Sequence, residues 1–286
     1  MKKSTVKTVA YNFRSISEMR ELCVSPSARA ERQVEANKHI YDRAVMKGKS
    51  QMSWYGLDST TDCLNAIENG NEQLTKKLMA HNITKKLPRA IGIGRQLFRG
   101  DMGDELDIHA VNGGRVDRAW SAKRRVVKRA RNNIKIVVDI GANCNVEASV
   151  LQCRGLAGAG LAIALEKAGY SVAVIAAFGS RSVVPDKHLL VTCTIKPAVG
   201  RISAGILATT VCLPGFFRTY GFGAIVRAAD LAGVQCHDGL GQTLAAETLL
   251  PDEPATMAIV VPVSVISDES AQAWILETIT LLERAS

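Results

Sequence analysis

The chain has 286 residues, of which 47% are hydrophobic, and its formal net charge is +9. This length and apolar content predict a buried core, in one large α/β domain or in a core domain with an extension. No uninterrupted apolar stretch reaches the roughly 18 to 20 residues of a membrane span, and no apolar segment follows the N-terminal lysines. We therefore expect neither a membrane partner nor a secretory leader.

The cysteines and histidines exclude the common disulfide and zinc frameworks. The seven cysteines are odd in number, scattered and without a C-x-x-C pair, and no two of the five histidines are four residues apart. This usage is typical of reduced thiols, so we expect a cytoplasmic location.

Positive charge is concentrated in the first half of the chain. Residues 1–133 hold 26 Lys and Arg against 14 Asp and Glu, a net charge of +12, whereas residues 134–286 have a net charge of −3. Such asymmetry favours a polyanionic partner, nucleic acid first, although solvated lysine-rich faces give the same count.

The composition divides the chain into three regions. Residues 1–50 are predicted to form a basic, mainly helical arm, because helix formers run as far as a glycine at position 48. Residues 51–133 are predicted to form a basic extension with two helices that meet near Asn69 and Gly70, followed by irregular structure. Within it, Trp54 is interpreted as a packing anchor.

The end of this extension holds the best candidate for phosphate contacts. Eight basic residues surround Trp120 between positions 115 and 131, and we expect a helix there. The alternative is a solvated helix whose arginines pair with the acidic cluster at Asp101, Asp104, Glu105 and Asp107. The candidate nucleic-acid-binding residues are Arg118, Trp120, Lys123, Arg124, Arg125, Lys128, Arg129 and Arg131.

Residues 134–286 are predicted to form an α/β domain. A continuous apolar run begins at Ile134, and a helix containing Gly155, Gly158 and Gly160 separates it from a second strand at 171–178. Further strands at 187–197 and 255–266, a helix before Gly233 and a terminal helix from about 267 continue the alternation. The pattern predicts a Rossmann-like, mostly parallel sheet with helices on both faces.

The loop after the first strand, Asp139 to Asn145, lies where open α/β sheets bind ligands. It lacks the G-x-G-x-x-G of a dinucleotide loop, and Cys144 has neither a neighbouring base nor the arginine of a C-x₅-R phosphate loop. The segments VVDIGANCN, CRG, LEKAGYSV and LPGFFRTYGF, together with SWYGLDSTTDCLNAIENGN, resemble von Willebrand factor A (VWA) domains, and more closely a family of phage-encoded VWA-like proteins. The resemblance covers residues 52–266.

This resemblance implies a Mg²⁺ site that has degenerated. VWA domains hold the ion with D-x-S-x-S, and here Asp139 is kept, Gly141 offers no side-chain oxygen and Asn143 replaces the second serine. Thr192 or Thr194 and Asp238 or Asp268 are the candidates for the distant ligands. We favour a loop without a cofactor, in which Asp139 bonds to local backbone and Asn143 caps the helix.

Enzymatic activity is not expected, because the chain has no G-x-S-x-G and no convincing Ser-His-acid set. The leading hypothesis is a non-enzymatic interaction protein in the host-cell cytoplasm, for which the resemblance suggests an AAA+ ATPase of the MoxR or chelatase type as partner. The alternative is a single-stranded DNA or RNA binding accessory factor that uses the basic half, with Trp54, Trp120, Tyr41 and Tyr55 among its basic residues. A third hypothesis is Mg²⁺-dependent ligand binding at the strand tip.

Overall fold

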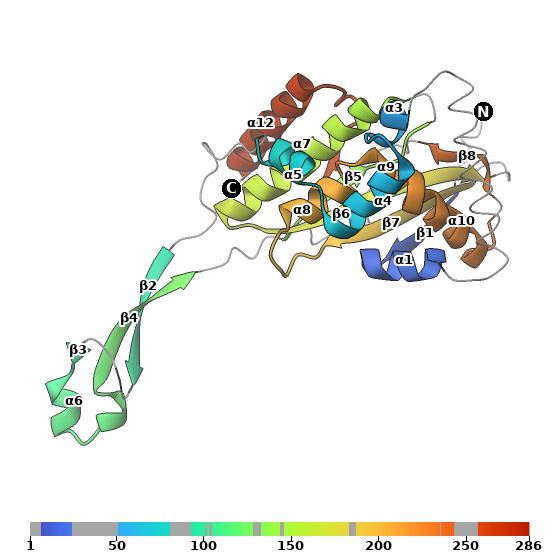
Figure 1. Cartoon of the computed structure of the whole chain (residues 1–286). Coiled ribbons are helices and arrows are strands. Elements are labelled where there is room, and N and C mark those ends of the chain that lie inside the picture. The colour runs from blue at the N-terminus through green and yellow to red at the C-terminus, as the bar shows by residue number, and fades with distance from the viewer. Residues whose placement is uncertain are drawn as a thin grey trace, which may run out of the picture.

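The apolar run at Ile134 forms β5 (Asn133–Asp139), an interior strand of a six-stranded sheet (Figure 1). The computed structural model describes residues 7–24, 51–80, 93–100, 102, 105–127, 133–143, 146–182, 187–234, 236–242 and 257–285. The sheet order is β1-β7-β6-β5-β9, and β8 pairs with β6. The other strands are β1 (Lys7–Phe13), β6 (Ser171–Ser182), β7 (Lys187–Lys196), β8 (Cys236–Gln242) and β9 (Met257–Val261).

The sheet is mixed, and parallel pairs predominate. β1 with β7, β5 with β6 and β5 with β9 are parallel, whereas β6 is antiparallel to β7 and to β8. Only four residues separate β6 from β7, which is too short for the crossover that a parallel pair requires. The predicted α/β class is thus confirmed, and the antiparallel pairing of β6 with β7 follows from their short connection.

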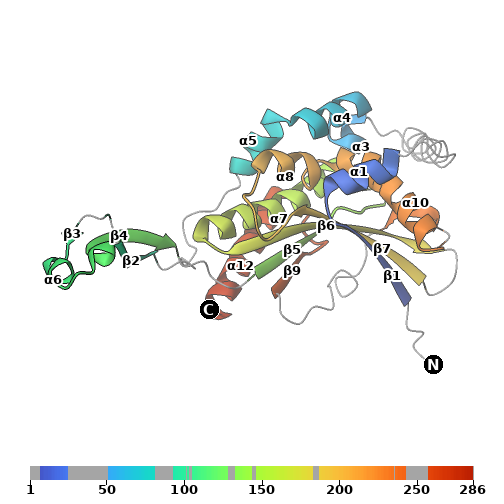
Figure 2. The same ribbon diagram turned by 90° about the horizontal axis from the view of Figure 1, so that it is seen from below.

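The described helices cover one face of this sheet. Ile134, Ile136 and Val138 of β5 join the main core together with residues of every neighbouring helix. Figure 2 shows α1, α7, α8 and α10 on the same side of the strands. The prediction of helices on both faces is wrong for the described residues. The opposite face contains the small cluster of Val137, Ala177 and Leu190, but also polar positions such as Thr192.

The helix α7 (Ala148–Ala168) is the core helix. A Cβ at Gly158 would overlap Val138 Cγ2, and one at Gly155 would overlap the carbonyl of Val211, so small residues allow this close approach. The helix is long and apolar enough to span a membrane by length and composition, yet 83% of that window is buried inside the protein. Its apolar surface therefore packs against the sheet and the neighbouring helices.

The remaining helices complete the body. α12 packs on α7, and α4 and α5 lie outside α8 and α9 (Figure 1). Their bounds are α1 (Ile16–Val24), α3 (Gln51–Tyr55), α4 (Thr60–Asn69), α5 (Glu72–Ala80), α8 (Ala204–Thr210), α9 (Pro214–Phe216), the π-helical turn η2 (Phe217–Gly221), α10 (Phe222–Leu231) and α12 (Asp268–Ala285).

The N-terminal segment differs from the predicted helical arm. Residues 7–13 form the edge strand β1, in which Phe13 pairs with Cys193 and joins the core, and α1 follows. The predicted helix over residues 27–48 lies outside the described residues. The first described residues thus belong to the main sheet.

A second, three-stranded sheet lies apart from the body, as both views show (Figures 1 and 2). Its order is β2-β4-β3, and β2 and β4 pair antiparallel from Ile93↔Val127 to Gly100↔Trp120. We call residues 93–127 the ribbon, residues 93–100 and 118–127 its stem, and residues 101–117 its tip. The elements are β2 (Ile93–Gly100), β3 (Glu105–Leu106), α6 (Ile108–Asn112), the 3₁₀ turn η1 (Val116–Arg118) and β4 (Trp120–Val127).

Candidate functional site

Asp139, at the C-terminal end of β5, is a buried carboxylate that accepts a hydrogen bond from the local backbone. Its side chain is 1% exposed, and Oδ1 accepts a hydrogen bond from Gly141 N at 2.9 Å. This confirms the interpretation that Asp139 bonds to local backbone. The predicted cap is wrong, because the helix begins at Ala148 after Glu147, and Asn143 is exposed four residues earlier.

Arg154 of α7 supplies a positive charge at this place. Its guanidinium is buried and donates from NH1 to the carbonyl oxygen of Asp139 at 3.2 Å. Burial lowers the pKa of Arg154, and the negative charge of Asp139 raises it. The carboxylate thus has a protein cation nearby, which reduces its attraction for a metal ion.

The space beyond the end of β5 is closed by β8. Gly241 of β8 has a φ of +82°, and a Cβ on it would lie 2.7 Å from Phe217 Cζ and 2.8 Å from Ala142 O. The backbone of β8 therefore lies directly against the loop after β5. The crevice in which open sheets bind ligands is filled here.

The described candidates for the distant ligands do not converge on Asp139. Asp139 pairs with Ala177, which pairs with Thr192, so Thr192 lies two strands away, about 10 Å. Thr192 Oγ1 donates to Asn12 Oδ1 at 3.1 Å, and Asp268 Oδ1 accepts from Cys153 Sγ at 3.3 Å. The side chain of Asp238 lies outside the described residues.

These residues do not fit a Mg²⁺ ion. Magnesium requires near-octahedral oxygen ligands at about 2.0 to 2.1 Å and keeps several waters, whereas Asp139 is buried beside an arginine. Within the described ranges, no three His, Cys, Asp or Glu residues gather as a metal site would need. The described residues at this end of β5 therefore give no support to a metal-dependent function.

The described cysteines are buried thiols. Burial raises the pKa of Cys63 to about 12, and burial with the hydrogen bond to Asp268 raises the pKa of Cys153 to about 11. Such thiols stay protonated and are poor nucleophiles near neutral pH. Cys144, the candidate at the strand tip, lies outside the described residues.

The basic segment after position 115 is a strand, so the predicted helix is wrong. Arg118 ends the turn η1, Trp120 begins β4, and Lys123, Arg124 and Arg125 pair in register with Leu97, Gln96 and Arg95. Alanine, lysine and arginine favour helix locally, but pairing with β2 outweighs that preference. Lys128, Arg129 and Arg131 lie outside the described residues.

The ribbon and its flanks are the most basic part of the chain. From residue 81 to 133 they hold 13 Lys and Arg against five Asp and Glu, a net charge of +8. The stem holds six basic residues and no acidic one, and the flanks 81–92 and 128–133 add six more, whereas the ribbon with its acidic tip has a net charge of +2. Positive charge is thus concentrated in the stem and in the segments that adjoin it in sequence.

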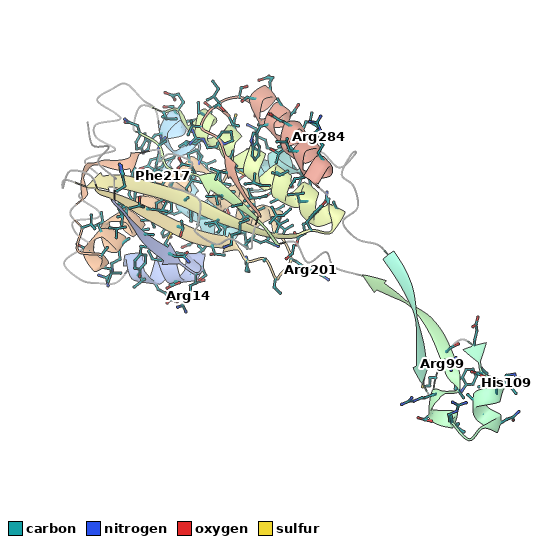
Figure 3. All side chains as sticks on the ribbon, turned by 180° about the vertical axis from the view of Figure 1, so that it is seen from behind. Arg14, Arg99, His109, Arg201, Phe217 and Arg284 are labelled. Carbon is teal, nitrogen blue, oxygen red and sulfur yellow. The ribbon has the colours of Figure 1, made fainter. Side chains whose placement is uncertain are left out.

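The acidic residues of the tip have local roles. Asp107 caps α6 by accepting from His109 N and Ala110 N, and its Oδ2 lies 3.7 Å from Arg99 NH1. Figure 3 shows Arg99 and His109 together at the far end of the ribbon. The predicted pairing with neighbouring arginines is confirmed for Asp107, and Asp101 and Asp104 lie outside the described residues.

The aromatic residues expected among the basic ones are elsewhere. Trp54 and Tyr55 are buried in the core at 2% and 6% exposure, which confirms Trp54 as a packing anchor. The guanidinium of Arg218 lies 3.8 Å from the ring centroid of Trp54 and donates to Trp54 O and Val146 O. Neither ring is available for base stacking, Trp120 is half-buried, and Tyr41 lies outside the described residues.

Sequence reasoning missed a polar hollow at the corner between α4 and α5. It has a volume of about 530 Å³ and is lined by Asp58, Asp62, Asn65, Asn69 and Glu72, among others. Asp62 accepts a hydrogen bond from Ser59 Oγ at 2.6 Å and belongs to the first turn of α4. The run of Asn, Asp and Glu around Gly70 was its only signal, and such residues are also typical of a turn.

The fold and these sites define a mixed α/β body that carries a basic β-ribbon. The chain belongs to the family described as Domain of unknown function (DUF7192), whose model matches residues 2–284. The match runs through β1, the ribbon and α12 alike. A search of curated proteins and a search of solved structures found no match.

Proposed function

We propose that this protein binds duplex DNA through the basic stem of the ribbon, with the α/β body as the platform that carries it. The single observation behind the proposal is the placement of a net charge of +8, out of +9, on residues 81–133. Contacts between basic side chains and phosphates dominate the affinity of proteins for DNA. The stem, with six basic residues and no acidic one, lies outside the body (Figure 1) and is therefore open to a long polyanion.

The shape of the stem fits a groove of the double helix. Two antiparallel strands of eight residues extend for about 26 Å, most of one turn of B-DNA. The major groove of B-DNA accepts a two-stranded ribbon, whereas the major groove of double-stranded RNA is too deep and narrow. Shape therefore favours DNA over RNA.

The burial of the aromatic rings favours duplex over single strands. Proteins that bind single strands combine basic grooves with exposed rings on which bases stack. Trp54 and Tyr55 are buried, and Trp120 is half-buried. A stem rich in arginine and lysine, whose described ring at Trp120 is half-buried, is suited to the phosphate backbone, with little dependence on sequence.

The test compares two triple variants in fluorescence anisotropy with a labelled duplex of about 20 base pairs. Lys123, Arg124 and Arg125→Ala removes three charges from the stem, and Lys167, Arg201 and Arg284→Ala removes three exposed charges from the body. Figure 3 shows Arg201 and Arg284 on the body. The stem variant should weaken binding and reduce the slope of log K against log salt by about two to three, since each phosphate contact contributes about 0.9.

The body variant should bind as the unchanged protein does. Absence of binding by the unchanged protein at about 50 mM salt would contradict the proposal, and so would equal losses in the two variants. A labelled single strand of the same sequence is the comparison. Tighter binding to the single strand would overturn the duplex form of the proposal.

The role as a VWA-like interaction protein with an AAA+ ATPase partner stays a prediction. In the loop after β5, to which the resemblance assigns the ion, Arg154 donates to the carbonyl oxygen of Asp139 and β8 lies against Ala142. The described residues give no specific support to that partner. They give none to the resemblance to phage VWA-like proteins either.

A further inference from the structure

The ribbon is electrically polarised along its length. The stem carries six basic residues and no acidic one, whereas the tip, residues 101–117, carries five acidic residues and one arginine. Glu105 and Asp117 are exposed in the tip, and Asp117 lies 3.6 Å from Arg118 at its boundary with the stem. The tip is therefore acidic and the stem basic, so the two ends of the ribbon have opposite charges.

The tip also exposes large apolar side chains. Met102 is 77% exposed, Ile108 63% and Val116 60%, and Leu106 and Val111 are exposed beside them. Single exposed apolar residues are ordinary on a protein surface, but a group of them within 15 residues is typical of an interaction site. The acidic residues among them argue against contact with DNA phosphates and favour a basic protein surface.

Among the described elements of the body, none forms a supporting layer on the ribbon. Its elements contact one another, and neither Figure 1 nor Figure 2 shows a helix of the body against its strands. Isolated two-stranded ribbons are marginally stable in water and gain stability from a further strand or layer. Among the described residues, β2 pairs with β4 only, so its outer edge is open to another strand.

We propose that two copies of this chain associate through their ribbons, aligned antiparallel, with the acidic, apolar tip of each copy on the basic stem of the other. The stem combines six basic residues and no acidic one with an edge, at β2, that pairs with no other described strand. Because the tip is at the far end of its own stem, it reaches such a stem only in a second copy. A two-fold arrangement forms the same contact twice and closes the assembly as a dimer.

This inference goes beyond DNA binding and does not rest on it, since the association needs no nucleic acid. Charge complementarity with a second copy selects the partner, and the charges are screened by salt. The dimer should therefore weaken as salt rises from about 50 mM to about 500 mM, where the Debye length falls to a few ångströms.

The experiment is a charge exchange between two variants, followed by sedimentation velocity without nucleic acid. Glu105→Lys with Asp117→Lys changes the net charge of the tip from −4 to 0, and Arg124→Glu with Arg125→Glu changes that of the stem from +6 to +2. Each variant alone loses much of the charge attraction in both contacts and should sediment as a monomer. Mixed in equal amounts, they form one contact between an unchanged tip and an unchanged stem, and the other contact places the new lysines opposite the new glutamates, so they should sediment as a heterodimer.

The matched control is Asp58→Lys with Glu277→Lys, which reverses two exposed acidic residues of the body and should leave the dimer unchanged. Thermal unfolding verifies that each variant retains a folded body. A monomeric unchanged protein at low salt would overturn the proposal. Variants that stay dimeric alone, or that stay monomeric when mixed, would also overturn it.

Discussion

Asp139 and Arg154 show how neighbouring charges decide what a strand tip can bind. Asp139 is the residue for which the sequence resemblance predicted a metal ligand, yet a buried guanidinium lies beside it and donates to its carbonyl oxygen. The pKa of Arg154 is lowered by burial and raised by Asp139, so the two groups depend on each other. The aspartate is therefore interpreted as a structural countercharge.

Replacing Asp139 with Asn tests this interpretation. Asparagine keeps an acceptor for Gly141 N but removes the charge that compensates Arg154, so the free energy of unfolding should fall by about 3 kcal/mol. Urea unfolding measures the loss, and Asp58→Asn, at an exposed position, should change it by less than about 0.5 kcal/mol. We expect Mg²⁺ and EDTA to give the same unfolding midpoint for each protein. Stabilisation by Mg²⁺ that is lost in Asp139→Asn would contradict the structural role.

Gly158 tests the close contact between α7 and the sheet. Alanine gains up to about 1 kcal/mol in helix propensity, but its Cβ would overlap Val138 Cγ2 and lie 3.0 Å from Val261 Cγ2. The cost of overpacking should exceed the gain in helix propensity, so Gly158→Ala should lower the free energy of unfolding by about 1 to 3 kcal/mol. Gly205→Ala in α8 is the control, because its Cβ would meet only Ser203 Oγ at 3.9 Å. That variant should be neutral or stabilised, and equal effects at the two positions would contradict the packing argument.

At the scale of single elements, local sequence patterns predicted the centre of the fold and missed its edges. β5, α7, β6 and α12 were predicted because each has a long apolar run or a clear cap. β4 was predicted as a helix because Ala122, Lys123 and Arg124 are good helix formers, and its pairing with β2 is a non-local contact that no local pattern reveals. β1 did carry a signal, since Val9, Tyr11 and Phe13 alternate as in a strand.

The candidate site was predictable only in part. Asp139 and the basic residues of the ribbon could be found from residue type and position. Arg154 could not be assigned as the partner of Asp139, because the sequence alone does not show which way a charged side chain in an apolar helix points. The closure of the strand tip by Gly241 also depends on where β8 pairs with β6.

The contact between α7 and α12 gives a prediction that depends on pH. The pKa of Cys153 is raised from 9.0 to about 11 by burial and by its hydrogen bond to Asp268, so the folded protein retains a proton that the unfolded chain releases above pH 9. This contribution to stability is present below about pH 9 and is lost as pH rises towards 11. Cys153→Ser cannot titrate there, and its stability should fall less steeply between pH 8 and 10.5 than that of the unchanged protein. Identical slopes in urea unfolding would contradict the raised pKa.

At the scale of the whole molecule, the hydrophobic core and the excess of basic residues lie in different parts of the chain. Among the described side chains, the main core includes residues from β1 to α12, but none between Leu78 and Ile134. The net charge shows the opposite distribution, since residues 81–133 hold +8 of the total of +9. The body and the ribbon should therefore be separable by engineering.

Replacing residues 93–127 with a short Gly-Ser linker tests this separation. Because the described main core contains no ribbon residue, the body should unfold cooperatively with a midpoint within about 3 °C of the unchanged protein. The same variant should lose duplex binding in anisotropy and self-association in sedimentation, since both are assigned to the ribbon. A shortened protein that folds and still binds duplex DNA would place the DNA contacts on the body or on the flanks 81–92 and 128–133, and one that fails to fold would show that the ribbon contributes to the core.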